Sequence, residues 1–540
     1  MRKWPLLALL FASLALAGVA VAGSDSSGAR AGGTVVVGIV EPSDLNVLLR
    51  DSGVGLWIAG RVLLGAYSVN SRGEYVPSLI AHEPRITRKP FSLTYTIKRK
   101  ARWSDGVPVS ARDFVFTWRV SADAKIDTDP YQHGLYAHVV RARILDAKTV
   151  RFVLDAPFAN WKDLFEFVLP WHALRGQDMR SVWRDAIDNP RTGDPISDGP
   201  FVFGSWSRGD RLTLVRNEHY WARKAHLSRL VFRFLPDAAS QLEAFRSHLV
   251  DLVLPLPDKL LLSDLTARPG VRIAKGASNV WEHIAFNLGP KANPLLRSPF
   301  VRRAIAYGID RHALVVQLYK ELFPGLKILQ SAVYLPFSPA YASHWQQWRY
   351  RPRTAVALLR SHGCRRGSDG IFSCRGRRLS FRFTSTSGNQ LRQLTFEQVQ
   401  AQLEAVGIEL QADFEPPALA FPRLEAGDWE IFLFAWNMAS EPTEGDASLF
   451  SCHAKLNVYG YCNARVTRLL DNALTKLRAT RRAALLNRAD ALMAKDVPFL
   501  PLFVKPGYAL YNSRIRNVVW NANADSMIFW NAQDWWIAPS

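Results

Sequence analysis

Residues 93–118 have the sequence LTYTIKRKARWSDGVPVSARDFVFTW, which combines three local signals. Polar and apolar residues alternate over Leu93–Lys98, as in a half-exposed strand. The WSDG segment Trp103–Gly106 is typical of a tight turn. Ser110 and Asp113 are spaced as a capping box at the start of a helix. The stretch therefore predicts a strand, a turn and a helix in immediate succession.

The same mixture of strand and helix signals continues along the chain. Gly33–Val40 is a β-branched run bounded by glycine, which predicts a buried strand. Residues 201–215 predict a hairpin with its turn at Ser207–Asp210, and Leu391–Val406 has helical apolar spacing before Gly407. Because strands and helices alternate irregularly and no repeat is visible, we predict a mixed α/β fold.

Length and composition indicate a multidomain globular protein. A chain of 540 residues suggests about three or four domains. The 68 basic and 47 acidic residues give a net charge of +21, which suggests nucleic acid, anionic lipid or an acidic wall polymer as neighbours. The arginines, however, are scattered singly rather than in blocks. We therefore expect no nucleic-acid partner.

The N-terminus predicts export. Arg2 and Lys3 precede an uncharged apolar run, and Ala20–Ala22 has the small-x-small pattern of a cleavage site. We expect residues 1–22 to be a signal peptide, with an uncleaved membrane segment as the alternative. No lipobox cysteine follows, and residues 23–33 are a Ser/Gly-rich flexible tether. An extracytoplasmic protein, either periplasmic or associated with the cell surface, is expected.

The four cysteines form two C-x9-C pairs, Cys364 with Cys374 and Cys452 with Cys462. Zinc sites usually have tighter C-x-x-C pairs with histidine partners, so a metal is the weaker interpretation. In an oxidising compartment each pair is expected to form a local disulfide.

Several blocks of sequence resemble, in order and spacing, the large extracytoplasmic solute-binding proteins of ABC importers. The resemblance is to their family 5, the peptide/nickel cluster that contains dipeptide- and oligopeptide-binding proteins. The matching blocks are Gly32–Thr34 with Glu41–Pro42, Gly73–Pro77, Trp103–Phe114, Gly199–Phe201 with Tyr220–Trp221, Val301–Arg311, and Pro498–Leu502 with Asp534–Trp536.

This resemblance implies a two-lobed periplasmic-binding-protein fold of type II, cluster C, with an extra inserted domain. Hinges are expected near Gly193–Ser197 and Gly276–Val280, where glycines permit backbone rotation. The expected parts are lobe I (34–75, 195–278 and 505–540), the inserted domain II (76–194) and lobe III (279–504).

The resemblance also implies where a ligand binds. Peptide-binding relatives hold the ligand's ammonium with an aspartate three residues after a tryptophan, followed by a D/E-P pair. Here Trp436 and Glu441–Pro442 match, but Ala439 or Met438 takes the place of the aspartate. Either Glu441 or Glu444 substitutes, or the ligand has no free α-amino group, and we favour the second. The expected ligand-binding residues are Trp436, Asn437, Met438, Ala439 and Glu441, with Asp44, Leu45, Asn46, Trp57, Tyr131, His133 and Trp281 from the other segments.

The implied function is capture of a peptide-like or other polar solute and its delivery to an ABC permease by a monomer, without catalysis, cofactor or metal. No nucleophile elbow, zinc-protease motif, P-loop or dinucleotide fingerprint occurs in the sequence. A secreted hydrolase is the alternative from another class. A sensor that presents its ligand to a membrane receptor is a further alternative with the same fold.

Overall fold

The computed structural model describes residues 31–50, 52–126, 130–255, 268–320, 323–438, 442–524 and 526–539. The predicted signal peptide and most of the predicted tether lie outside these residues. Helices and strands alternate irregularly along the described chain, which confirms the predicted mixed α/β class.

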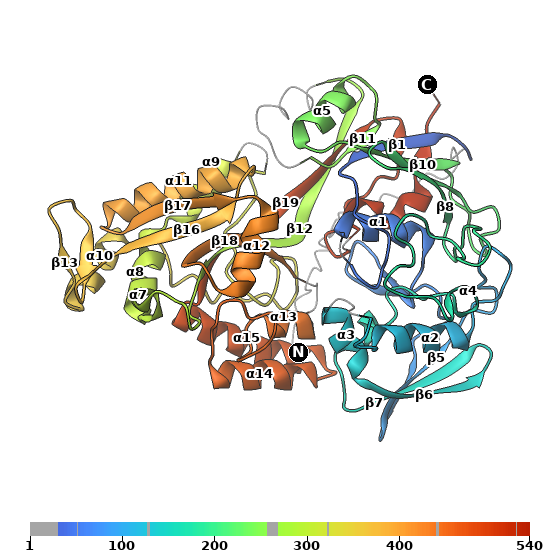
Figure 1. Ribbon diagram of the computed structural model, residues 1–540, viewed down its shortest axis with the longest axis horizontal. Helices are drawn as coiled ribbons and strands as arrows, with labels where there is room; N and C mark the ends of the chain where they lie inside the picture. Colours follow the sequence, from blue (N-terminus) through green and yellow to red (C-terminus); the bar gives the residue numbers. More distant parts are fainter. Residues whose placement is uncertain are drawn as a thin grey trace, which may run out of the picture.

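One ten-stranded sheet runs through both lobes, in the order β17-β16-β18-β12-β19-β11-β1-β10-β9-β8 (Figure 1). The long strands β12 and β19 pass from one lobe to the other and join the two halves of the sheet. The bounds are β1 (Thr34–Ile39), β8 (Phe201–Ser207), β9 (Arg211–Arg216), β10 (Arg229–Phe234), β11 (Leu252–Val253), β12 (Val271–Phe286), β16 (Ser380–Thr386), β17 (Glu409–Glu415), β18 (Ile431–Asn437) and β19 (Phe499–Asn512).

Lobe I is built on the first predicted strand. β1 pairs in parallel with β10 and β11, and the β8–β9 hairpin turns between Ser207 and Arg211, so the predicted strand and hairpin are both confirmed. The 3-10 helix η3 (Met527–Asp534) packs against α1 (Gly53–Val62), while the helix α5 (Ala238–Arg246) lies beside β1 and β11. The C-terminal tail is therefore part of this lobe.

Domain II contains residues 93–118, with their strand, turn and helix in immediate succession. Its four-stranded sheet has the order β4-β5-β7-β6, with β4 at Arg85–Arg88, β5 at Phe91–Thr96, β7 at Thr149–Leu154 and β6 at Val139–Asp146. The helix α2 (Ala111–Ser121) begins at Ser110, whose backbone N–H and hydroxyl both donate to Asp113 Oδ2, which confirms the predicted capping box. The helices α3 (Pro130–Ala137) and α4 (Trp171–Leu174) complete this part.

The buried side chains divide into two large cores. One core takes residues from lobe I and domain II together, including Trp103, Tyr95 and Trp535. The other lies within 281–504 and includes Trp281, Trp345 and Phe499. Lobe I and domain II thus share one interior. The numerical domain boundaries given above stay a prediction.

Lobe III surrounds β16, β17 and β18 with helices (Figure 1). The helices are α7 (Pro294–Arg297), α8 (Pro299–Gly308), α9 (Arg311–Tyr319), α10 (Pro352–Ser361), α11 (Gln390–Ala405), α12 (Pro417–Ala426), α13 (Glu444–Ser448), α14 (Ala464–Leu474) and α15 (Ala479–Asp496). Small strands occur at β2 (Tyr67–Val69), β3 (Tyr75–Pro77), β13 (Arg365–Arg366), β14 (Phe372–Cys374), β15 (Arg377–Arg378), β20 (Ile515–Arg516) and β21 (Trp536–Ile537).

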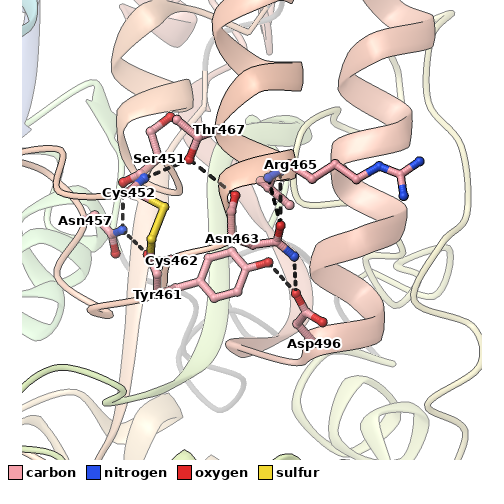
Figure 2. The surroundings of a disulfide bond; sticks show 10 residues. Ser451, Cys452, Asn457, Tyr461, Cys462, Asn463, Arg465, Thr467 and Asp496 are labelled. Atoms are coloured by element: carbon pink, nitrogen blue, oxygen red, sulfur yellow. Dashed lines mark hydrogen bonds between the residues drawn. A yellow bond between two sulfur atoms is a disulfide. The ribbon is translucent and has the colours of Figure 1, made fainter.

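Both predicted disulfides are present in lobe III: Cys364 is bonded to Cys374 and Cys452 to Cys462. Figure 2 shows how the loop closed by the second bond is fixed to its neighbours. Tyr461 Oη donates to Asp496 Oδ2 over 2.7 Å, and Asn457 Nδ2 donates to the carbonyls of Ser451, just before the loop, and of Tyr461 within it. The disulfide and these bonds together hold the segment that carries Tyr459.

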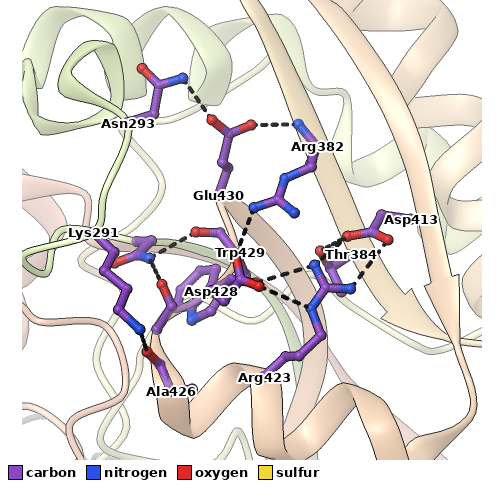
Figure 3. Close-up of polar contacts among 12 residues, drawn as sticks. Lys291, Asn293, Arg382, Thr384, Asp413, Arg423, Ala426, Asp428, Trp429 and Glu430 are labelled. Carbon is purple, nitrogen blue, oxygen red and sulfur yellow. Dashed lines mark hydrogen bonds and ion pairs between the residues drawn. The ribbon is translucent and has the colours of Figure 1, made fainter.

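A polar network holds the N-terminal end of β18 (Figure 3). Glu430 accepts from Asn293 Nδ2 and from the backbone N–H of Arg382, each over 2.7 Å. Arg423 pairs with Asp413 at 3.0 Å and contacts Asp428. These contacts fix the start of β18 to β16, β17 and α7. The position of the C-terminal residues of β18 is therefore defined as well.

The two connecting strands meet at a pair of glycines. Gly276 of β12 is opposite Gly507 of β19, and the ladder is irregular between Ala277 and Trp281. The indole of Trp520, from the C-terminal tail, lies directly on both glycines, and its Nε1 donates to Ala277 O over 2.7 Å. This is the region predicted as a hinge, and only residues without a Cβ leave room for the indole.

Gly507→Ala is expected to destabilise the protein by about 1–3 kcal/mol, because the added Cβ would overlap the Trp520 ring. Chemical denaturation measures this change. The cost should shrink in a Trp520→Ala background, whereas an equal cost in both backgrounds would show that the ring is not the cause. Gly325→Ala, where the added Cβ meets no atom, is the control and should stay within about 0.5 kcal/mol of the parent.

Candidate functional site

The C-terminal end of β18 lies beside β12, in the part of the sheet that follows the glycine pair. Trp436 is opposite Trp281, and Asn437 is opposite Val280. Paired residues of an antiparallel ladder share a face, and successive residues alternate between faces. Trp436 and Trp281 therefore lie on one face of the sheet, while Asn437 and Glu282 lie on the other.

On the first face, a hydrogen-bonded chain fixes the ring of Trp436. Its Nε1 donates to Tyr459 Oη over 2.9 Å, and Tyr459 Oη is 2.9 Å from His283 Nε2. Burial lowers the pKa of His283 to about 3, so the imidazole is neutral and its Nε2 can accept. Tyr459 thus accepts from the indole and donates to the imidazole. The half-buried Trp436 is held in one orientation by a buried partner.

Tyr459→Phe is expected to lower the free energy of unfolding by about 1–3 kcal/mol, because the indole N–H and the imidazole nitrogen both lose their partner. Thermal or urea unfolding measures the loss. The tyrosine is fully buried, so a change of surface hydration offers no competing explanation. If the variant unfolded at the same denaturant concentration as the parent, that result would contradict the hydrogen-bonded chain from Trp436 through Tyr459 to His283.

On the second face, three charged side chains form a cluster in which Glu282 and Arg392 are buried and Lys505 is partly exposed. Arg392 Nε is 2.7 Å from Glu282 Oε1, and Lys505 Nζ is 2.8 Å from Glu282 Oε2. Arg392 also donates to Thr386 Oγ1 over 2.7 Å. Burial by itself would raise the pKa of Glu282, but Lys505 and Arg392 outweigh it and lower this pKa to about 2. The cluster holds one carboxylate and two cations, so its net charge is +1.

Backbone bonds connect this cluster to the end of β18 and to the irregular part of β12. The Met438 N–H donates to Asn279 O over 2.8 Å, and Ser278 Oγ donates to Lys505 O over 2.7 Å. The end of β18, the irregular middle of β12 and the end of the lobe III half of β19 are therefore a single bonded unit at the junction of the lobes.

Domain II meets lobe III next to this unit. Asn160 Nδ2 donates to Pro442 O over 3.1 Å, and the Ala159 N–H donates to Leu474 O over 2.7 Å. The helices α3 and α13 lie side by side (Figure 1). The helix α13, which follows β18 in the chain, thus lies against α3, which carries the predicted Tyr131 and half-buried His133. That these segments form two walls of a ligand site stays a prediction.

Three predicted residues occupy other surroundings than expected. Trp281 has no exposed surface and stacks on His283 with ring centroids 4.5 Å apart. Leu45 belongs to the core shared by lobe I and domain II. Asn46 is buried, and its Nδ2 donates to Met179 O over 2.9 Å. In this structure these side chains pack in the interior, and their contact with a ligand stays a prediction.

The remaining predicted residues differ in exposure. Asn437 is exposed and Met438 is buried. Asp44 is largely buried and accepts from the Asn46 N–H, and Trp57 packs on Phe529. Ala439 and Glu441 lie outside the described residues, and of Tyr131 only the backbone is described. Direct contact of any of these with a ligand stays a prediction.

Sequence reasoning missed the residues that organise this region. Glu282, Arg392, Lys505 and Tyr459 had no assigned role. A signal for one of them existed: Glu282 lies among the mostly apolar residues 280–286 (VWEHIAF), and a buried acid in such a position requires a cationic partner. The identity of that partner, 110 residues away in sequence, could not be deduced.

The structure thus has two lobes joined by the strands β12 and β19, with a polar unit at their junction. Residues 74–456 match the family model of bacterial extracellular solute-binding proteins, family 5. The chain therefore belongs to this family. Among curated relatives, the oligopeptide-binding protein OppA of Mycobacterium tuberculosis is 26% identical over 437 residues, covering 79% of this chain and 71% of OppA.

Solved structures show the same fold. A periplasmic EDTA-binding protein, EppA, superposes with a TM-score of 0.86 at 20% identity, covering 95% of this chain and 97% of that chain. The oligopeptide-binding protein AppA from Bacillus subtilis, solved with a nonapeptide, gives a TM-score of 0.78 at 20% identity, covering 94% of this chain and 100% of AppA. The expected periplasmic-binding-protein fold and family are thus confirmed.

None of the helices in the described ranges is long and apolar enough to cross a membrane. The described residues also contain no group of three or more histidine, cysteine, aspartate or glutamate side chains placed to hold a metal ion.

Proposed function

We propose that this protein captures a polar, peptide-like solute that lacks a free α-ammonium group and delivers it to an ABC permease without altering it chemically. The solute would lie between α3 on one side and the end of β18, with Trp436 and Asn437, on the other. Trp57, His133 and the segment 438–441 complete the proposed set.

The observation that carries this proposal is the charge around the end of β18. A bound ammonium needs a desolvated carboxylate, since an uncompensated buried charge costs several kcal/mol. The sequence lacks the aspartate after Trp436, and Glu282 is already paired with both Arg392 and Lys505. Asp446 is bound to the Thr443 N–H and hydroxyl in the cap of α13. A cluster of net charge +1 disfavours an ammonium and favours a neutral or acidic group.

Release and delivery follow from the two-lobe architecture. A solute that contacts both lobes stabilises the closed arrangement by the difference between its affinities for the closed and open states. The bonds from Asn160 and Ala159 to lobe III then form together with the solute contacts. We further infer export by residues 1–22, an extracytoplasmic location, and action as a monomer.

Paired peptides test this proposal by isothermal titration calorimetry. N-acetylated peptides are expected to bind more tightly than the same peptides with a free N-terminus. Ala439→Asp restores the family's acid by sequence and should reverse the preference. Tighter binding of the free peptides by the parent protein would overturn the proposal.

A further inference from the structure

Arg61 is a cation in the interior of lobe I. It lies in the last turn of α1, and only 8% of its surface is exposed. Its Nη1 donates to Phe529 O, in η3 of the C-terminal tail. Within the part of the chain that the structure describes, this is its one hydrogen bond, no carboxylate pairs with it, and its Nε is buried without a partner. Most N–H donors of this guanidinium are therefore left unused by the protein.

Three other buried arginines show how this chain stabilises an enclosed guanidinium. Arg302 donates through its three nitrogens to four backbone carbonyls. Arg311 donates to four backbone carbonyls as well. Arg392 is paired with the carboxylate of Glu282. Arg61, with its single carbonyl, differs from all three.

The charge of Arg61 requires a partner from outside the described chain. Burial lowers the pKa of Arg61 to about 10, so the guanidinium is still charged at neutral pH. The negative end of the α1 dipole offsets only a part of the cost of burying this charge. A carboxylate is the most suitable partner, because its two oxygens match the planar fork of a guanidinium.

The position of Arg61 connects it with the proposed solute site. Trp57 precedes it by one turn on the same face of α1. The ring of Trp57 packs on the ring of Phe529, whose carbonyl accepts from Arg61. The same C-terminal tail carries Trp520, which lies on the glycine pair between the lobes. Arg61 is thus a charged neighbour of Trp57, which belongs to the set proposed for the solute.

From these observations we propose that Arg61 binds an acidic group of the solute, with the two oxygens of a carboxylate accepting from the guanidinium. The inference rests on the proposed function and extends it, because it names a group that the solute carries. The solute is then an acid without a free α-ammonium group, such as an N-blocked peptide with a free C-terminal carboxylate.

Calorimetric titration with two N-acetylated peptides of the same sequence tests this proposal. One peptide has a free C-terminal carboxylate and the other a C-terminal amide. The parent is expected to bind the acid about 10- to 100-fold more tightly, as for hydrogen bonds to a charged group. In Arg61→Met the affinity for the acid should fall to that for the amide, which stays near the parental value. Arg229→Gln removes an exposed charge from lobe I and should keep the parental preference.

Thermal melting of the solute-free proteins separates binding from a structural role. Arg61→Met removes an uncompensated charge and should melt close to the parent, whereas Arg302→Met loses four hydrogen bonds and should melt lower. Equal losses of acid and amide affinity in Arg61→Met would show a structural role and overturn the proposal, as would equal parental affinity for the two peptides.

The comparison of acid with amide is independent of the comparison of acetylated with free N-termini. Tighter binding of free N-termini by the parent would overturn the proposed function alone. The acid and amide forms of those free peptides would then test Arg61 in the same way, with the same expected loss of preference in Arg61→Met.

Discussion

Arg392→Met is expected to lower the free energy of unfolding by about 3–5 kcal/mol, because it leaves the buried carboxylate of Glu282 with only one of its two cations. Arg392 also loses its bond to Thr386. Urea denaturation followed by circular dichroism measures the change. The control is Arg382→Met, which removes an ion pair whose side chains are 41% and 57% exposed and should cost no more than about 1 kcal/mol.

The cost of Arg392→Met should also depend on pH. The folded-state pKa of Glu282 is about 2 against an ordinary 4.5, so its carboxylate stabilises the folded state fully above pH 4.5. This contribution is lost as the pH falls through the folded-state pKa. The difference between parent and variant should therefore be constant near neutral pH and shrink from pH 4.5 towards 2. A difference that is unchanged over this range would mean that packing, rather than charge, sets the cost.

Trp436→Ala is expected to weaken solute binding by about 2–4 kcal/mol, or roughly 30- to 1,000-fold, because the ring contributes a rigid aromatic surface at the site. Calorimetric titration with the tightest acetylated peptide measures this effect. Trp436→Phe keeps a ring but loses the bond to Tyr459, so it should fall between the parent and the alanine variant. Parental affinity together with lowered stability would place Trp436 in the interior alone.

The sequence was most informative where structure is decided by neighbouring residues. The capping box of Ser110 and Asp113 and the two disulfides each involve partners within about ten positions, and local geometry determines them. The sequence also pointed to Gly276, as a hinge candidate whose backbone can rotate freely, and a hinge at this position stays a prediction. What the structure shows there is a close approach of another group. The identity of that group, Trp520, lies 244 residues from Gly276 and could not be inferred.

The candidate site was less predictable, since two tryptophans on the same face of the sheet have different surroundings. Trp281 and Trp436 are opposite each other in the ladder, yet the first is enclosed by the core of lobe III and the second is half-buried. Only the placement of β18 at the edge of the region that faces α3 distinguishes them, and that placement depends on contacts between segments far apart in sequence.

Native mass spectrometry of the protein as purified tests the central claim most directly, because it detects any solute retained between the lobes. We predict one bound solute per chain, with a mass that matches a compound lacking a primary amine, and its loss in the Trp436→Ala variant. A ladder of masses that corresponds to ordinary peptides with free N-termini would contradict the account. Such a ladder would show that an acid other than Glu282 binds the ammonium group.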